Sequence, residues 1–225
     1  MRIVTRYGVQ VLVATMLGTV LYCTIYVYAP YRREQRIARN LESFGAYVEW
    51  HSARCWPESG IWDMVPVWDR IRRIDHFGRR IPSDAGAELG SLKNLEWFEM
   101  ERSIASESEM EQILLQLGRI SRLRYLALGD TSLTDAGLQH LRESKLTSLG
   151  LSRTRISDVG IESLSDQTDL YELDLTDTAV SDIGLESLYN LVNIKKVRLT
   201  ETQTTADGRN KLRKALPNCK ITPDP

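Results

Sequence analysis

The sequence predicts an α/β solenoid, in which short parallel strands alternate with helices and each unit stacks on the next, preceded by one apolar N-terminal helix. Three observations predict this fold class. The second half of the chain repeats itself about every 24 residues, each copy joins a strand pattern to a helix-start pattern, and residues 7–31 form one long uncharged run. A unit this short cannot bury its own apolar face, so neighbouring units must share one core.

The repeats are clearest in three adjacent segments that align with one another. These are LRYLALGDTSLTDAGLQHL, LTSLGLSRTRISDVGIESL and LYELDLTDTAVSDIGLESL, which begin at Leu123, Leu146 and Leu170. A fourth copy, IKKVRLTETQTTADGRNKL, loses the Asp-x-Gly-Leu register, and two weaker copies, IRRIDHFGRRIPSDAGAEL and LEWFEMERSI, precede the clear ones. We therefore assign residues 71–225 to one repeat domain with a C-terminal cap.

Each unit combines a strand with a helix. Apolar residues alternate with others, as in Leu126-Ala127-Leu128, which is typical of a short strand with one buried face. A threonine follows, whose hydroxyl group can satisfy backbone groups where the chain turns. A Thr-Asp or Ser-Asp pair then supplies a capping hydroxyl and a first-turn carboxylate. We interpret the periodic aspartates as helix caps rather than as metal ligands or catalytic carboxylates; they are Asp135, Asp158 and Asp182.

These units resemble the leucine-rich-repeat family. They match the variant Leu-x-x-Leu-x-Leu-x-x-Thr-x-hydrophobic-(Ser/Thr)-Asp-x-Gly-Leu-x-x-Leu, which is close to the cysteine-containing and ribonuclease-inhibitor-like subclasses. The resemblance covers residues 95 to about 212, departs from the family at the extra residues 107–112, and implies a right-handed solenoid with strands on a concave face and helices on a convex face. The ending LRKALPNCKITPDP, the apolar N-terminal run and an Arg-rich connector together resemble bacterial single-span members of the family.

Residues 7–31 predict a transmembrane helix that follows a short tail at residues 1–6. The run YGVQVLVATMLGTVLYCTIYVYAPY has no charged residue, and a helix of this length spans roughly 37 Å, more than a hydrocarbon core of about 30 Å. Tyrosines crowd its C-terminal end, and Arg32 and Arg33 follow at headgroup level. A cleaved signal peptide is disfavoured by the length of the run and by Pro30, and a buried core helix by the lack of a polar face.

The orientation of this single-pass membrane protein rests on two opposing arguments. More arginines follow the apolar run than precede it, which favours a cytoplasmic repeat domain. A very short tail followed by a large domain is the usual arrangement of an exported domain. We expect the repeat domain to be extracytoplasmic.

Residues 32–70 are predicted to form a juxtamembrane helix and an aromatic-rich N-terminal cap. Ile37, Leu41 and Phe44 have helical spacing, and Gly45 is a natural helix stop. The segment CWPESGIWDMVPVW suits an irregular stretch that covers the open first turn of the solenoid. The tryptophans could instead mark a partner surface.

The sequence offers little for catalysis, metals or nucleic acid. The 29 basic residues balance the 30 acidic ones, so nucleic acid is not an expected partner. The three cysteines form neither a disulfide framework nor a metal motif, and we expect no bond between Cys55 and Cys219. Neither His140, on a repeat helix, nor the pair His51 and Cys55 predicts a metal site, and His76 occupies an apolar repeat position. We expect no cofactor and no enzymatic activity.

The candidate partner-binding residues lie between the strand leucines, where their side chains point outward. In the middle two units these residues are small and predict a shallow trough, with aromatic residues on one side and charged residues on the other. We predict a membrane-anchored, non-catalytic protein that binds a protein or peptide or acts as a scaffold. An F-box-type leucine-rich-repeat substrate adaptor and a self-associating structural envelope protein stay as alternatives. The candidate residues are Trp97, Glu99, Tyr125, Ser148, Glu172, Asp174, Lys196 and Arg198.

Overall fold

The computed structural model describes residues 18, 21, 29–52, 69–78, 81 and 83–223. Nearly all of the predicted transmembrane helix at 7–31 and the whole tryptophan-rich segment at 53–68 lie outside this described part of the chain. Among the described residues, no helix has both the length and the apolar character needed to cross a membrane. The membrane-spanning helix therefore stays a prediction.

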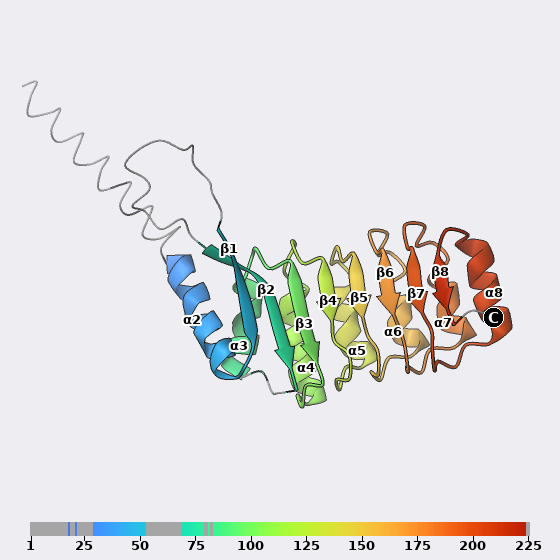
Figure 1. Cartoon of the computed structure of the whole chain (residues 1–225), viewed down its shortest axis with the longest axis horizontal. Helices are drawn as coiled ribbons and strands as arrows, with labels where there is room; N and C mark the ends of the chain where they lie inside the picture. The colour runs from blue at the N-terminus through green and yellow to red at the C-terminus, as the bar shows by residue number, and fades with distance from the viewer. Residues whose placement is uncertain are drawn as a thin grey trace, which may run out of the picture.

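One eight-stranded sheet, in the order β1 to β8, forms one side of the described molecule (Figure 1). β1 is antiparallel to β2, and every later strand is parallel to its neighbours. The two weak copies in the sequence form β2 and β3, as predicted. The strands are β1 (Tyr47–Ser52), β2 (Asp69–Phe77), β3 (Trp97–Glu101), β4 (Tyr125–Ala127), β5 (Ser148–Gly150), β6 (Glu172–Asp174), β7 (Lys196–Arg198) and β8 (Lys220–Thr222).

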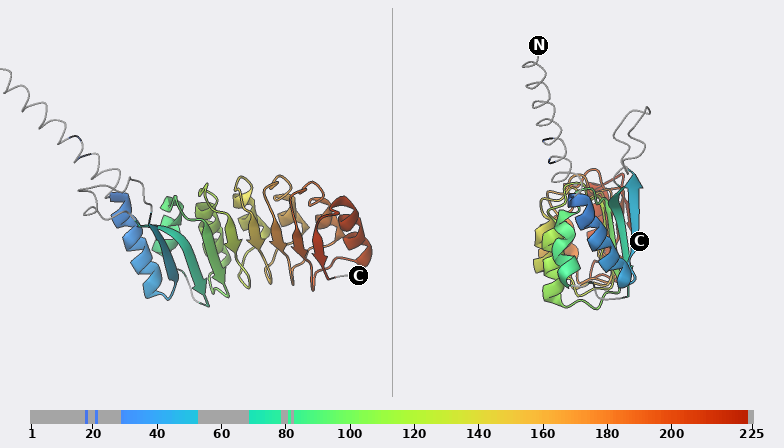
Figure 2. Two further views of the ribbon diagram at one scale, coloured as in Figure 1. Left: turned by 45° about the horizontal axis from the view of Figure 1, so that its top comes forward. Right: turned by 90° about the vertical axis from the view of Figure 1, so that its left-hand side faces the viewer.

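The helices of the repeats cover the other side of the sheet, as the end-on view in Figure 2 shows. Strands and helices enclose one continuous core, in which the repeat leucines such as Leu126, Leu149 and Leu173 are at most 1% exposed. The predicted α/β repeat architecture is thus confirmed. The helices are α2 (Ala29–Ser43), α3 (Ser83–Glu88), α4 (Glu107–Leu117), α5 (Asp135–Leu138), α6 (Asp158–Glu162), α7 (Asp182–Glu186) and α8 (Ala206–Ala215).

The threonine after each strand closes the turn, as the sequence indicates. Each hydroxyl group donates a hydrogen bond of 2.6–2.8 Å to the carbonyl oxygen three residues earlier, at the end of the strand. The residue just before these threonines has a left-handed backbone, with φ between 54° and 58°. This repeated turn sends the chain from the sheet towards the helix layer. The donors are Thr131, Thr154, Thr178 and Thr202.

The periodic aspartates join neighbouring repeats, which corrects their interpretation as simple helix caps. Asp158 does begin α6, but its carboxylate accepts the backbone N–H of Ser181 at 2.8 Å and the Ser181 hydroxyl at 2.6 Å. Ser181 is the N-cap residue of α7, in the next repeat. The same two contacts, at the same distances, join Asp135 to Ser157 and Asp182 to Thr205. The starts of α6, α7 and α8 are therefore each held by the repeat before them.

The glycine of the Asp-x-Gly motif makes room for this contact. A Cβ atom on Gly184 would overlap Oδ1 of Asp158, and one on Gly208 would overlap the carboxylate of Asp182. Gly160 stands in the same relation to Asp135. The aspartate and the glycine of the repeated motif thus serve one contact, in which the carboxylate comes from one unit and the glycine from the next.

The N-terminal end of the core is covered by α2 and β1. α2 packs against β1, β2 and α3 and buries Ile37 and Leu41. The helix ends at Ser43, and a Schellman motif with Gly45 follows, because Ala46 N–H donates to the Leu41 carbonyl and Gly45 N–H to that of Glu42. The predicted helix and its stop are confirmed. The strand β1 was not predicted from the sequence, although Val48 and Trp50 alternate with outward residues in the manner of a strand.

Polar contacts tie this cap to the first repeat. Glu34 is 4% exposed and accepts the backbone N–H of Ile71 at the start of the repeat region. Arg36 binds Glu88 of α3 at 2.7 Å, and Arg33 lies 3.4 Å from the same carboxylate. The hydrogen bond from Arg36 holds the pKa of Glu88 below its usual value, with Arg33 adding to the effect.

Candidate functional site

The outward side chains of the sheet, which we call the exposed strand face, form two rows set by the strand register. All eight candidate residues from the sequence lie in these rows. Their role in binding stays a prediction. The first row is Glu49, Arg73, Trp97, Tyr125, Ser148, Glu172, Lys196 and Lys220; the second is Tyr47, Asp75, Glu99, Ala127, Gly150, Asp174, Arg198 and Thr222.

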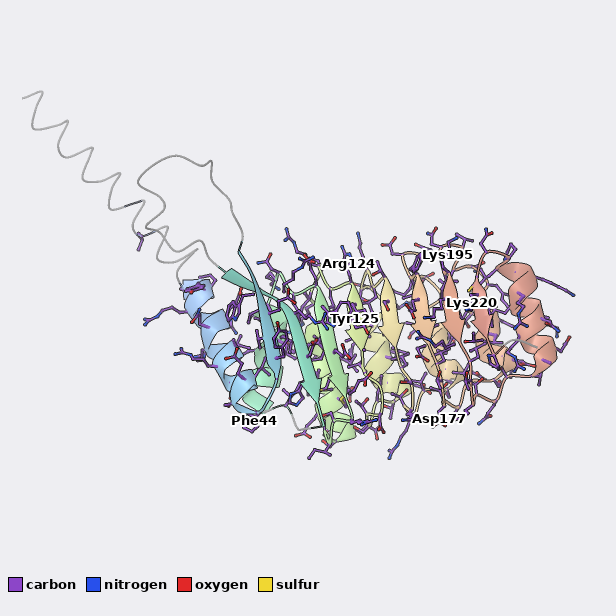
Figure 3. The ribbon with its side chains drawn as sticks, viewed as in Figure 1. Phe44, Arg124, Tyr125, Asp177, Lys195 and Lys220 are labelled. Atoms are coloured by element: carbon purple, nitrogen blue, oxygen red, sulfur yellow. The ribbon has the colours of Figure 1, made fainter. Side chains whose placement is uncertain are left out.

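Trp97 and Tyr125 form one aromatic stack rather than two separate anchors (Figure 3 labels Tyr125). Their ring centroids are 3.3 Å apart and the ring planes differ by 8°. The Arg73 guanidinium lies over the Trp97 ring, with its Cζ 4.3 Å from the centroid. Sequence reasoning did not include Arg73 among the candidates, although its place one repeat before Trp97 in the same row could have shown it.

The carboxylates beside this stack are partly removed from water. Glu99 accepts a 3.3 Å hydrogen bond from Trp97 Nε1, and burial raises its pKa above the usual value despite that bond. Burial also raises the pKa of the Tyr125 phenol, and the negative charges of Glu99, Glu101 and Glu172 add to the rise. Three carboxylates therefore act on the Tyr125 phenol, and the positive charge of Arg73 opposes them.

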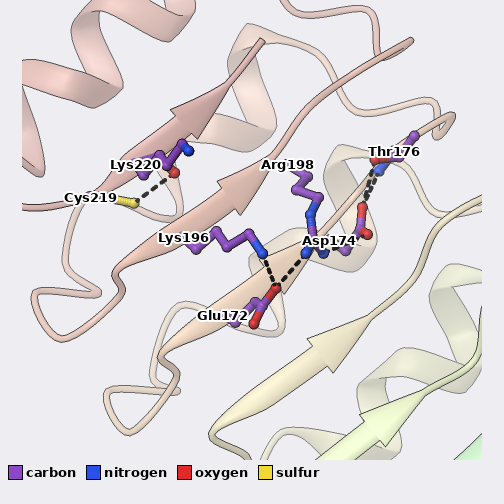
Figure 4. A network of polar contacts seen from close by, with 7 residues as sticks. All are labelled: Glu172, Asp174, Thr176, Lys196, Arg198, Cys219 and Lys220. Carbon is purple, nitrogen blue, oxygen red and sulfur yellow. Dashed lines mark hydrogen bonds and ion pairs between the residues drawn. The ribbon is translucent and has the colours of Figure 1, made fainter. Parts of the chain in front are cut away.

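At the other end of the face, β6 and β7 carry a closed network of ion pairs (Figure 4). Glu172 accepts from Lys196 and from Arg198, at 2.8 Å each. Asp174 accepts from Arg198 at 2.9 Å and from the Thr176 hydroxyl at 2.6 Å. The acidic residues of β6 and the basic residues of β7 therefore neutralise one another.

Between the stack and the network lies the trough, which we define by the small outward residues of β4 and β5 and the positions just after them. Ala127 is only 5% exposed although it faces outward, so the floor lies below the larger side chains around it. A Cβ atom on Gly129 would lie 3.4 Å from Glu101 Oε1, which shows that Glu101 leans from β3 over the trough. The trough residues are Ala127, Gly129, Ser148, Gly150 and Ser152.

A hollow of about 380 Å³ adjoins the stack at the edge of the sheet where the strands begin (Figure 3 labels Arg124). Its arginines already have partners. Arg72 pairs with Glu96 at 2.8 Å, and Arg124 donates to the carbonyl oxygens of Ser121 and Leu123. The hollow is lined by Glu49, Arg72, Arg73, Glu96, Trp97, Arg124, Tyr125 and Thr147.

The other groups that could carry chemistry are dispersed. No group of three or more His, Cys, Asp or Glu residues within the described ranges could hold a metal ion. His76 is fully buried, as its repeat position predicts, and His140 lies 3.5 Å from Glu111 on the helix side. Cys219 is half-buried, and burial raises the pKa of its thiol. His51 side-chain contacts, Cys23 and Cys55 lie outside what the structure describes.

The comparison with protein-family models agrees with this repeated geometry. The family model described as "Leucine Rich repeat" matches residues 144–165, which contain β5 and α6. The match identifies a leucine-rich repeat in this segment and supports a leucine-rich-repeat family for the chain. No curated protein matches it.

Two solved structures similar to this chain come from bacteria. An internalin of Listeria monocytogenes is 18% identical, with a TM-score of 0.47; the match covers 62% of this chain and 44% of that one. A leucine-rich-repeat protein of Leptospira interrogans is 15% identical, with a TM-score of 0.40, and the coverage is 67% and 48%. The chain thus spans less than half the length of either structure.

Proposed function

We propose that this leucine-rich-repeat protein is a non-catalytic interaction module that binds a protein or peptide on its exposed strand face. The observation that carries the proposal is the stack of Trp97 and Tyr125 on a sheet face that no other described element covers. Helices cover the opposite side of the sheet, so the fold itself does not need these outward rings for its core.

The stack has the properties of a binding anchor. Partly exposed aromatic residues bind by giving up contact with water, and two rings already held against each other lose little conformational freedom when a partner arrives. Charged residues on both sides of the trough supply a polar surround. Repeat folds present such rows on a rigid frame, which favours recognition over catalysis.

We further propose that residues 7–31 anchor the protein as a single-pass membrane protein with an extracytoplasmic repeat domain. The support is the uncharged length of the run, the tyrosines at its end and the arginines that follow. Extraction of membranes at alkaline pH tests the anchor: full-length protein should stay in the pellet, and protein lacking residues 1–31 should not. Protease access to a C-terminal tag in intact cells then tests the orientation.

Crosslinking in the native membrane, followed by mass spectrometry, tests the interaction. Trp97→Ala/Tyr125→Ala should lose the main crosslinked partner while the circular dichroism spectrum stays unchanged. The matched control is Val159→Ala/Ile183→Ala, which removes two apolar side chains that are 60% and 72% exposed and belong to the helix side. A partner kept by the aromatic variant would refute binding at the stack, and crosslinks only between copies of the chain would favour the structural alternative.

A further inference from the structure

The two sides of the trough differ in how their charges are balanced. We call them the β2–β3 bank and the β6–β7 bank, after the strands that carry them. On the β6–β7 bank, Glu172 and Asp174 face Lys196 and Arg198, so the charges cancel. The β2–β3 bank carries three outward carboxylates, those of Asp75, Glu99 and Glu101. Among the paired outward positions of these two strands, Arg73 is the one basic residue. A surplus of negative charge therefore lies on the side of the trough that carries the aromatic stack.

Arg73 cannot neutralise this bank alone. Its Nε donates to both carboxylate oxygens of Asp75 at 2.9 Å, while its Nη2 is 4.0 Å from Glu99. The Glu101 carboxylate lies close to Gly129 of the trough. Like charges also act on this bank, because the carboxylates of Asp75 and Glu101 both raise the pKa of Glu99.

The Tyr125 ring, from β4, lies beside this bank and faces the trough. One of its faces lies on Trp97, and the next residue of the row on the other side is Ser148, whose side chain is small. Aromatic ring faces attract cations, and a partly desolvated site strengthens this attraction. β4 and β6 are two strand spacings apart, about 10 Å, which is wide enough for one extended chain or one long side chain.

From this charge complementarity and geometry we propose that the trough binds a cationic side chain, arginine or lysine, that an extended segment of a partner protein presents. The inference rests on the proposed function and names the chemistry of the partner. The cation lies against the outer face of Tyr125 and between the carboxylates of Glu99 and Glu101, and its methylene groups cover Ala127 and Gly150. In the adjoining hollow, Arg72 and Arg73 pair with carboxylates, and Arg124 donates to the backbone carbonyl oxygens of Ser121 and Leu123.

Fluorescence anisotropy with the full chain in non-ionic detergent tests this proposal. The probes are three labelled Gly-Ser peptides with three arginines, three glutamines or three glutamates at the same positions. We expect binding of the arginine peptide only, weakening as salt is raised. Glu99→Gln/Glu101→Gln should reduce its affinity about tenfold, because two partly screened charge contacts each change affinity a few-fold. Tyr125→Leu should weaken binding by about fivefold and Tyr125→Phe should not, because phenylalanine keeps the ring.

Glu162→Gln/Glu186→Gln is the control with the same change in net charge, since both residues are exposed on the helix side. If it weakens binding as much as Glu99→Gln/Glu101→Gln does, bulk charge explains the binding and the proposal is wrong. If the arginine peptide does not bind, but crosslinking still finds a partner that requires Trp97 and Tyr125, the face recognises another chemistry and the proposed function stands. If that partner also survives the aromatic substitutions, both proposals fail.

Discussion

The regular repeats and the irregular repeat before them start their helices in different ways. α6 and α7 are five residues long, and the N-cap residue of each is held by an aspartate of the preceding repeat. α4 is eleven residues long and has its own capping box, in which Ser106 and Glu109 bind each other's backbone N–H groups. The regular region therefore links each helix to its neighbour, whereas the irregular repeat satisfies its helix locally.

The substitution Gly184→Ala is expected to reduce stability most, because it disturbs the contact between repeats. The new methyl group would overlap the Asp158 carboxylate and separate it from Ser181, so we expect a loss of about 2–3 kcal/mol in the free energy of unfolding. Urea denaturation measures it. Gly86→Ala in α3 is the control, because its Cβ would meet Ile113 at an ordinary 3.5 Å and should stabilise the protein by about 0.5 kcal/mol. Equal effects of the two substitutions would contradict the inter-repeat contact.

Asp158→Ala removes the same contact without overlap and should cost about 2 kcal/mol. The Ser181 backbone N–H and hydroxyl both lose their acceptor, but Ser181 can still accept the N–H of Ile183. Hydrogen exchange should therefore speed up at Ser181 in the next repeat, more than at residues of α6. Protection at Ser181 equal to that of the wild type would show that the carboxylate does not hold it. Glu162→Ala, at the end of α6, is the control and should change little.

Ser106→Ala should cost about 1 kcal/mol, the usual effect of losing an N-cap hydroxyl. Because the capping box lies within one helix, faster exchange should be confined to the first turn of α4. Amide exchange measured by NMR checks this. Spread of the effect into α5 would mean that α4 depends on its neighbours as the regular helices do.

The smallest effect is expected from acidification at Asp182. Hydrogen bonds from the Thr205 hydroxyl and backbone lower the pKa of Asp182 below its usual value of 3.8. A lowered pKa in the folded state contributes stability that is present above the unfolded value and is lost as pH falls through the folded value. Thr205→Val removes the hydroxyl donor. The variant should therefore have a lower unfolding midpoint in urea than the wild type at pH 6, and this difference in midpoint should be smaller at pH 2. A difference that does not change with pH would exclude this linkage. The pH-dependent part of the difference is expected to be small because water still reaches the carboxylate.

The sequence predicted those parts of the fold that depend on local repetition. Outward and inward strand positions follow from alternation, and the turn threonines and the stop at Gly45 follow from local hydrogen bonding and backbone freedom. In the same way, the register placed all candidate residues on one face before any distance was known.

Contacts between repeats could not be predicted from one unit at a time. The stack of Trp97 on Tyr125, the ion pairs between β6 and β7, and the link from Asp158 to Ser181 all join residues 23 to 28 positions apart. Residues this far apart in the sequence come into contact only because neighbouring strands pair without offset. The strand β1 was missed for a related reason: it belongs to no repeat, and its partner β2 runs antiparallel to it.

The strands from β3 to β8 pair without offset, so the width of the trough depends only on the number of repeat units between its two sides. Duplication of one unit between β5 and β6 would move the charge network away from Tyr125 by one strand spacing, about 4.8 Å, without a new core. Loss of one unit would bring them together by the same step. Evolution of such a chain could therefore resize the group it recognises by gene duplication or deletion within the repeat array, while every side chain on both banks stays unchanged.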